Sequence, residues 1–245
     1  MVPLQSSQYE ISSAYHKTSR YLRRILKFEQ MDFEFALWQM FYLFVAPQKL
    51  TKLFRARKNS KSQYARDDPA FLILFSCALA LTSVGFAVVL GLGFLQFLKF
   101  LMLVIFVDCV GLGVLIATLL WYLTNRFLKP KNTPQDVEWG LAFDIHLNAF
   151  FPPIILLHCI QLFFYNGYIN HEWFVSILLG NTFWLAASVY YIYITFLGYN
   201  SMQLLNGTNL FLAPIPWLAF AYVITLVCRV NISHIVLNFY KYRVL

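Results

Sequence analysis

Five long apolar runs, separated by short polar stretches, dominate the pattern of this chain. They cover residues 71–95, 100–123, 147–165, 174–198 and 210–228. A helix needs about 20 apolar residues to cross a bilayer core roughly 30 Å thick, and each run meets or nearly meets that length. Asp108 is the single acidic residue inside the runs, which contain no Lys or Arg. The pattern predicts an all-α, polytopic membrane protein with five transmembrane helices.

Ahead of the first run, residues 1–68 form an arm that is expected to fold into short amphipathic or interfacial helices. The first is basic, because four cations follow i, i+3, i+4, i+7 spacing with apolar residues on the opposite side. These cations are Arg20, Arg23, Arg24 and Lys27. Residues 31–46 are apolar on nearly every face but too few to span a bilayer. They are therefore expected to lie in the membrane interface or to pack under the bundle.

A third short helix of the arm can open at Pro47, since proline suits the first turn of a helix. Its expected apolar side consists of Leu50, Leu53 and Phe54. Its expected basic side consists of Lys49, Lys52 and Arg57. After it, Asp67 and Asp68 precede Pro69, where their carboxylates can cap the first N–H groups of the first span. Arg66 is expected to pair with either acid.

The charge distribution predicts an orientation for the chain. Apolar residues make up 60% and charged residues 12%, and the net charge is +8. Twelve of the 19 Lys and Arg lie in residues 1–68, and three more lie in the loop 124–146. The positive-inside rule therefore places the N-terminus in the cytosol, and five crossings send the C-terminus to the lumen. The expected organisation is a cytosolic arm at 1–68, a bundle at 69–230 and a short luminal tail at 231–245.

The cations of the arm form the first candidate site. They can grip anionic lipid headgroups, each contributing about 1 kcal/mol near such a membrane, or can dock a protein partner. The candidate residues are Arg20, Arg23, Arg24, Lys27, Lys49, Lys52, Arg55, Arg57 and Lys58. The alternative is that these charges only enforce topology. RNA binding is disfavoured, because the chain has no RNA-recognition motif.

Polar residues inside the predicted spans form the second candidate site. Helical rise places Asp108, His158 and Asn181 roughly 10–12 Å from the same membrane surface, so they are expected to converge in an intramembrane polar layer. Gln161, three residues after His158, can extend it. Such a layer can conduct protons or a small solute, can serve a scramblase-like lipid pathway, or can simply fix helix packing through hydrogen bonds. The packing interpretation is the favoured one.

A third polar group lies at the cytosolic mouth of the third span, in the segment 136–150. Asp136, Asp144 and Asn148 share one helical face at i, i+4 spacing, and His146 lies on another. Asp144, His146 and Glu138 are candidate metal ligands, but no HExxH or HxxxH pattern supports a metal site. Capping and salt links are favoured instead. The chain also has no GxSxG, Walker or GxGxxG motif, so neither an enzyme nor a cofactor is expected.

Seven blocks of the chain occur in the order found in one known family. They are QMDFEFALWQMFYLF, QYARDDPAFL, DCVGLGVLIATLLW, DVEWGLAFDIHLNAF, GNTFWL, YYIYITFLGY and the terminal FYKYRV. On these blocks the chain resembles the uncoordinated-fifty homologues, which are multispan Golgi proteins distantly similar to the Yip-type family. The resemblance covers about residues 25–245.

The resemblance implies a helical bundle in Golgi membranes with a cytosolic N-terminal arm. It implies a role in vesicle trafficking, including delivery of receptors to the cell surface, and association with a large guanine-nucleotide exchange factor for Arf GTPases. RNA binding and residence in the inner nuclear membrane are also attributed to members. No catalytic residues carry over from the family, and the sequence leaves open whether the chain forms homo-oligomers.

Overall fold

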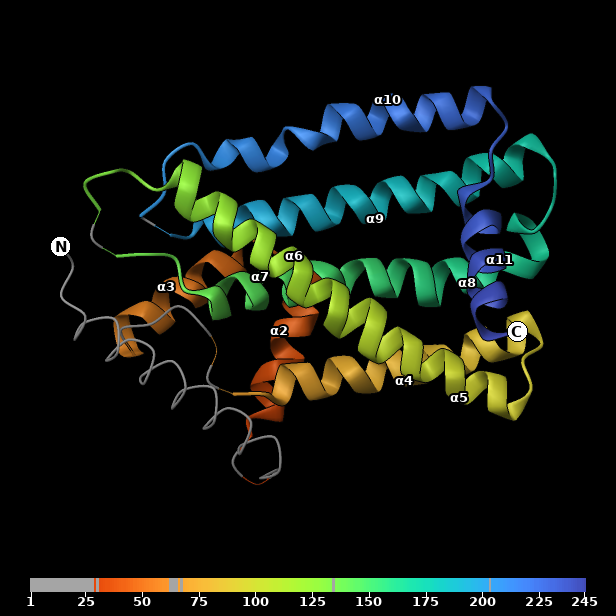
Figure 1. The fold of residues 1–245 in the computed structure, drawn as a ribbon, viewed down its shortest axis with the longest axis horizontal. Coiled ribbons are helices and arrows are strands. Elements are labelled where there is room, and N and C mark those ends of the chain that lie inside the picture. Colours follow the sequence, from red (N-terminus) through yellow and green to blue (C-terminus); the bar gives the residue numbers. More distant parts are fainter. Residues whose placement is uncertain (1–28, 30, 62–65, 67, 134, 203) are drawn as a thin grey trace.

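The computed structural model describes residues 29, 31–61, 66, 68–133, 135–202 and 204–245. Within this part of the chain every regular element is helical, and five helices are long and apolar enough to cross a membrane. They cover Ala70–Leu90, Phe94–Leu128, Trp139–Ile169, Phe174–Asn200 and Thr208–Val227. The long helices run side by side (Figure 1). The predicted fold class, an all-α polytopic membrane protein with five spans, is confirmed.

Two of the five long helices contain π-helical turns. The second consists of α5 (Phe94–Met102), η2 (Leu103–Gly111), α6 (Leu112–Leu123) and η3 (Thr124–Leu128). The third consists of α7 (Trp139–Ile154), η4 (Ile155–Ile160), α8 (Gln161–Phe164) and η5 (Tyr165–Ile169). The first and fourth are α4 (Ala70–Leu90) and α9 (Phe174–Asn200), and the fifth joins the 3-10 turn η6 (Thr208–Leu212) to α10 (Pro214–Val227). π turns widen a helix locally and often mark functional positions.

The third long helix begins at Trp139, eight residues before the predicted start at 147. Asp144 therefore lies inside a membrane-length helix, and the prediction that Asp108 is the only acid in the spans was wrong. The helix continues through its polar positions because Leu141, Ala142 and Ile145 are buried on one side of it. The polar residues between them have hydrogen-bonding partners in the fold, as described below.

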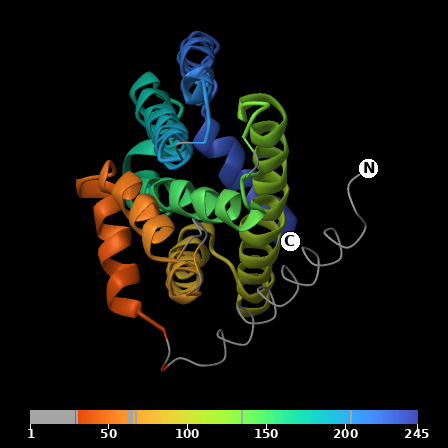
Figure 2. The same cartoon turned by 90° about the vertical axis from the view of Figure 1, so that its left-hand side faces the viewer.

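The arm contributes α2 (Phe33–Val45) and α3 (Lys49–Lys61). Asp32 caps α2 by accepting a hydrogen bond from Phe35 N at 2.8 Å. Asp68 accepts from Asp32 N at 2.7 Å and from Ala70 N at 3.0 Å, which ties the start of α2 to the start of α4. Figures 1 and 2 show α2 lying across the direction of the long helices, against the outside of the bundle.

The last helix, α11 (Ile232–Val244), lies across the opposite end of the bundle (Figure 1). Asn231 caps it by accepting a hydrogen bond from His234 N at 3.2 Å. The described arm and the C-terminal helix are thus separated by the length of the bundle, as an odd number of crossings requires. We call these the arm end and the tail end of the molecule.

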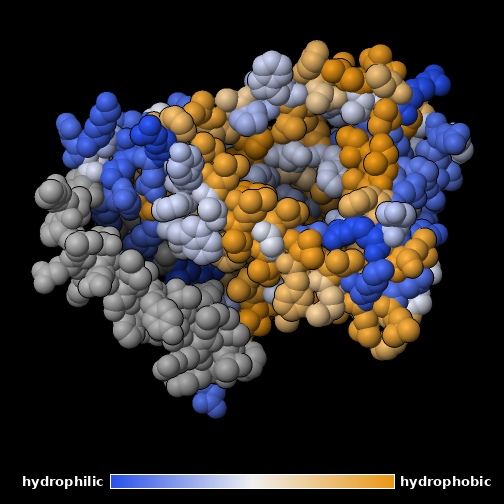
Figure 3. All heavy atoms as spheres, viewed as in Figure 1, coloured by the Kyte–Doolittle hydropathy of each residue, from blue (hydrophilic) through white to orange (hydrophobic). Residues whose placement is uncertain are grey.

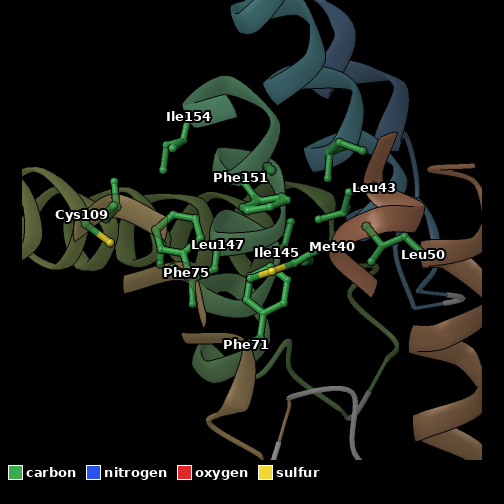
Figure 4. Packing of buried hydrophobic residues seen from close by; sticks show 14 of the residues in the cluster. Met40, Leu43, Leu50, Phe71, Phe75, Cys109, Ile145, Leu147, Phe151 and Ile154 are labelled. Carbon is green, nitrogen blue, oxygen red and sulfur yellow. The ribbon is translucent and has the colours of Figure 1, made fainter. Parts of the chain in front are cut away.

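The arm and the bundle share one hydrophobic core. Figure 4 shows Met40, Leu43 and Leu50 of the arm beside Phe71 of α4 and Phe151 of α7. The rings of Phe71 and Phe151 meet edge to face with their centroids 6.1 Å apart. The Phe44 ring of α2 also meets the Phe151 ring, with centroids 5.8 Å apart, so α2 and α3 are parts of the folded domain and not a detached tether.

The surface is organised for a lipid environment. A broad apolar belt separates two polar ends (Figure 3). Large apolar side chains such as Leu81, Val88 and Leu115 are more than half exposed on the belt. Apolar side chains that face outward around a helical bundle are suited to contact with the lipid tails of a bilayer. The chain is therefore a multi-pass membrane protein.

Candidate functional site

A buried ionic cluster joins the arm to the third span. Asp144 of α7 is 4% exposed. Its Oδ2 lies 2.8 Å from Arg57 Nη1 of α3, and its Oδ1 lies 2.8 Å from Arg66 Nη2 at the approach to α4. One carboxylate thus contacts two cations from two different parts of the arm. We call Asp144, its two arginines, Gln39 and Asn148 the arm junction.

Two amides complete the arm junction. Gln39 of α2 donates from Nε2 to Asn148 Oδ1 at 2.8 Å and accepts at Oε1 from Arg57 Nη2 at 3.2 Å. Asn148 also accepts from Arg66 Nη2 at 3.3 Å and donates to Asp144 Oδ1 at 3.2 Å. Gln39 and Asn148 are 2% and 0% exposed, so their polar atoms depend on these partners. Each arm segment therefore contributes one side chain to a single network on α7.

The physical reason for the cluster is the cost of an unpaired charge inside a helical bundle. A buried carboxylate is tolerated only when cations and hydrogen-bond donors surround it. The Arg66 guanidinium also lies 4.2 Å from the centroid of the Phe71 ring, a favourable cation–π geometry. Asp144 therefore pairs with both cationic segments at once and links the arm to α7.

The structure places Arg57 on the buried side of α3. It follows Leu50 and Phe54 at i, i+4, i+7 spacing, and both of those side chains are buried. The assignment of Arg57 to the basic side, with Lys49 and Lys52, was wrong for this reason. Arg66 pairs with Asp144, a partner 78 positions away that local sequence did not suggest.

The remaining candidate cations of the arm lie in different surroundings. Lys49 and Lys52 are exposed, with Lys49 Nζ 3.8 Å from the centroid of the Tyr42 ring. Arg55 is exposed and donates from Nε to Ser201 O at 3.4 Å. The other candidates fall outside the described residues or have side chains that are not described, and they stay a prediction. These are Arg20, Arg23, Arg24, Lys27 and Lys58.

The other residues of the segment 136–150 do not meet at one point. Asp136 forms an ion pair with Lys129 and is largely exposed. His146 contacts the Tyr191 hydroxyl through Nδ1 at 2.9 Å, whereas Asp144 and Asn148 belong to the arm junction. Within the described ranges, no three His, Cys, Asp or Glu side chains are grouped so that they could hold a metal ion.

The polar residues of the expected intramembrane layer are distributed along α11. Arg243 of α11 pairs with Asp108 at one end of the helix. The His158 ring meets Phe86 edge to face with centroids 4.7 Å apart, and Phe86 in turn packs against Tyr240 of α11. Each of these residues thus has its own neighbours under α11.

Gln161 of α8 and Asn181 of α9 contact the start of the same helix, α11. Gln161 Nε2 donates to Ser233 Oγ and to Gly180 O, the latter at 3.3 Å. Asn181 donates to Val230 O at 2.8 Å and accepts from Ile232 N at 3.0 Å, so it fixes the turn between α10 and α11. A Cβ atom on Gly180 would lie 2.9 Å from Ser233 Oγ, which explains a glycine at this contact.

Tyr240 of the tail helix lies near the charge of Asp108 in the second span. Burial and the nearby Asp108 carboxylate together raise the pKa of Tyr240 to about 12, although Arg243 opposes the rise. Its hydroxyl is therefore neutral at any physiological pH. The partners supplied by the tail were not predicted. A signal for them is present, because Ser233, Leu237, Tyr240 and Val244 follow the i, i+4, i+7, i+11 spacing of a packed helical face.

Comparison with known proteins gives a consistent result. The model of a family described as the UNC-50 family matches residues 21–241. A relative in Drosophila melanogaster, Protein unc-50 homolog, is 53% identical over 242 residues, covering 99% of this chain and 88% of the relative. The Homo sapiens protein of the same name is 50% identical over 229 residues, covering 93% and 88%. Protein unc-50 of Caenorhabditis elegans is 52% identical, covering 94% and 76%. No solved structure matches the chain.

Proposed function

Because the chain belongs to the UNC-50 family, we propose that it is a non-enzymatic Golgi membrane protein acting in vesicle trafficking. In this proposal its arm end recruits a large guanine-nucleotide exchange factor for Arf GTPases to the membrane. The same activity supports delivery of receptors to the cell surface. The proposal combines what the family resemblance implies with the way the arm is held on the bundle.

The observation that carries the proposal is the arm junction. A recruitment surface must hold its binding groups at fixed positions relative to the membrane, since each group that is ordered only on binding reduces affinity. Asp144 holds both Arg57 and Arg66, and Gln39 adds α2 to the same network. The exposed Lys49 and Lys52 are therefore presented from an ordered helix.

The exposed face of α2 supports a position at the membrane interface. Phe35, Leu37, Trp38, Phe41 and Val45 are all exposed on it. A short helix that lies across the spans and carries an aromatic, apolar face is suited to the boundary between headgroups and acyl chains. With α2 at that depth, α3 follows directly after Pro47 and its exposed lysines can reach anionic headgroups.

The distribution of cations supports a cytosolic arm end. The described part of that end carries Lys49, Lys52, Arg55 and the loop cations Lys129 and Lys131, whereas the tail end carries fewer. The orientation can be tested with two engineered glycosylation sites in microsomes, one in the loop 129–133 and one appended after Leu245. Glycosylation of the appended site alone supports the orientation, and glycosylation of the loop alone refutes it.

Neutralising matched sets of cations at the two ends tests the recruitment itself. The arm-end variant carries Lys49→Gln, Lys52→Gln and Arg55→Gln, and the control carries Lys99→Gln, Arg229→Gln and Lys241→Gln at the tail end. All six side chains are exposed, so both variants should fold. We expect the exchange factor to leave Golgi membranes only in cells that express the arm-end variant. Equal recruitment by the two variants would refute the role of the arm.

A further inference from the structure

The C-terminal helix α11 contacts the long helices at positions set back from their tail ends. Near the start of α11, Ser233 lies against Gly180, which is six residues after the start of α9. Near its end, Tyr240 packs against Phe86 and Phe100. These lie four residues before the end of α4 and six after the start of α5. At the rise of a helix, the contacts are about 6–9 Å below the ends of the spans.

The axis of α11 runs across the direction of the spans. Figure 1 shows this crossing, with the turns that join α4 to α5 and η5 to α9 reaching beyond it. Figure 2, which looks along the long helices, shows α11 passing behind them towards α5. It packs against both α9 and α5. A helix with this direction and this depth lies parallel to the membrane plane, inside the tail-end half of the bundle.

Three sides of α11 carry three different kinds of side chain, as a step of about 100° per residue requires. The side packed on the bundle consists of Ser233, Leu237, Tyr240 and Val244. An exposed apolar stripe on the opposite side consists of Ile235, Phe239 and Tyr242, each more than half exposed. An exposed polar stripe between these two sides consists of His234, Asn238 and Lys241.

Arg243 shows which way the polar stripe faces. Arg243 projects from the side of α11 opposite that stripe and pairs with Asp108. Asp108 is eight residues further along the second span than Phe100, so it lies closer to the middle of the bundle. With Arg243 directed towards the middle of the membrane, the polar stripe faces the headgroups at the tail end. The apolar stripe then faces sideways, away from the bundle.

We propose that α11 is embedded in the tail-end leaflet, with its apolar stripe packed against the acyl chains of phospholipids. Three large apolar side chains in a row would be unfavourable in water. The adjacent helix α5 also exposes Leu95, Leu98 and Met102, so the stripe adjoins the apolar belt. Residues 232–244 are then part of the membrane domain instead of a luminal tail. The proposal holds whichever side of the membrane the tail end faces, and so it is independent of the proposed function.

Spin labels on the full-length chain in nanodiscs test this position. The four native cysteines are replaced by alanine, and one cysteine at a time is introduced at each position of the two stripes. All six of these side chains are exposed, so the variants should fold. Collision of the label with oxygen, which concentrates in hydrocarbon, is compared with collision with a nickel chelate, which stays in water. The references are Leu81→Cys on the apolar belt and Lys131→Cys in an exposed loop.

We expect labels at Ile235→Cys, Phe239→Cys and Tyr242→Cys to give the oxygen-to-nickel ratio of Leu81→Cys. Labels on the polar stripe should give ratios between the two references, because they face the headgroups. Ratios on the apolar stripe equal to that of Lys131→Cys would overturn the proposal, since α11 would then be exposed to water. Higher ratios on the polar stripe than on the apolar stripe would overturn it as well.

A second copy of the chain is the other possible occupant of the apolar stripe, and the same labels detect it. In liposomes that hold many copies, a stripe covered by acyl chains should show no more magnetic coupling between copies than the Leu81→Cys reference. Strong coupling at Ile235→Cys and Tyr242→Cys, absent at Leu81→Cys, would make a second copy the occupant and would overturn the assignment to lipid.

Discussion

Arg243 Nη1 lies 2.9 Å and 2.8 Å from the two carboxylate oxygens of Asp108, a residue 135 positions earlier in the chain. Both side chains are 18% exposed. The pair joins the end of α11 to the π-helical part of the second span. It neutralises the acid that the sequence marks as most unusual, and it does so with a residue from the tail.

We expect this pair to couple strongly in a double-mutant cycle. Arg243→Gln leaves a carboxylate without its cation, and Asp108→Asn leaves the cation without its carboxylate. Each should lower the free energy of unfolding by about 1.5–3 kcal/mol, as for hydrogen bonds to charged groups. The double variant should lose clearly less than the sum, because it leaves no lone charge. Thermal unfolding in detergent measures this, and strict additivity would show that the contact is not energetically important.

The arm junction gives a second prediction. Asp144→Asn removes the carboxylate shared by Arg57 and Arg66, which should cost about 3–5 kcal/mol, as breaking a buried ion pair does. The loss should be concentrated in the arm, so hydrogen exchange in α3 should accelerate more than in α9. Asp136→Asn is the matched control. Its carboxylate is 72% exposed in the pair with Lys129, so its loss should cost less than about 1 kcal/mol. Equal effects of the two substitutions would contradict the special role of Asp144.

Close packing of the third and fourth spans gives a third prediction. A Cβ atom on Gly198 would lie 2.8 Å from both Cγ1 and Cγ2 of Ile145. Gly198→Ala should therefore destabilise the fold by about 1–3 kcal/mol through overpacking. Adding Ile145→Ala should recover part of that loss by making room. Gly167→Ala, where nothing lies within 4 Å of the new atom, should leave the unfolding temperature unchanged.

The sequence predicted the five spans well, because a helix that crosses a bilayer needs a run of about 20 apolar residues, and such a run is easily recognised. The first apolar run was expected to reach 95, whereas α4 ends at Leu90 because Gly91 adopts a left-handed conformation at φ 64°. At the third span the expectation began too late, since Asp144 and His146 interrupt the apolar stretch ahead of residue 147. Polar residues within an apolar run indicate the end of a membrane-spanning helix only if their side chains have no hydrogen-bonding or ionic partner in the fold.

The partners of those groups could not be derived from local spacing. Gln39 lies 109 positions from Asn148, and Arg57 lies 87 positions from Asp144. Helical periodicity reports which side of an element is buried, and it does place Arg57 beside Leu50 and Phe54. It does not report which distant element covers that side. The same distinction explains why the candidate polar residues of the spans were identified while their contacts with α11 were not.

Tyr240 gives a prediction about alkaline pH. Burial and Asp108 raise its pKa in the folded chain to about 12, above the value of 10.0 for an unperturbed tyrosine. The neutral phenol is therefore favoured by folding. Its contribution is fully present below pH 10 and is lost as the pH rises from 10 through 12. Tyr240→Phe cannot ionise, so the stability difference between wild type and variant should change by about 1–2 kcal/mol across that interval. Unfolding in detergent between pH 9 and 12 measures the difference, with Tyr242→Phe, an exposed neighbour on the same helix, as control. A difference that stays constant over the interval would mean that Tyr240 is not buried against Asp108 in the folded protein.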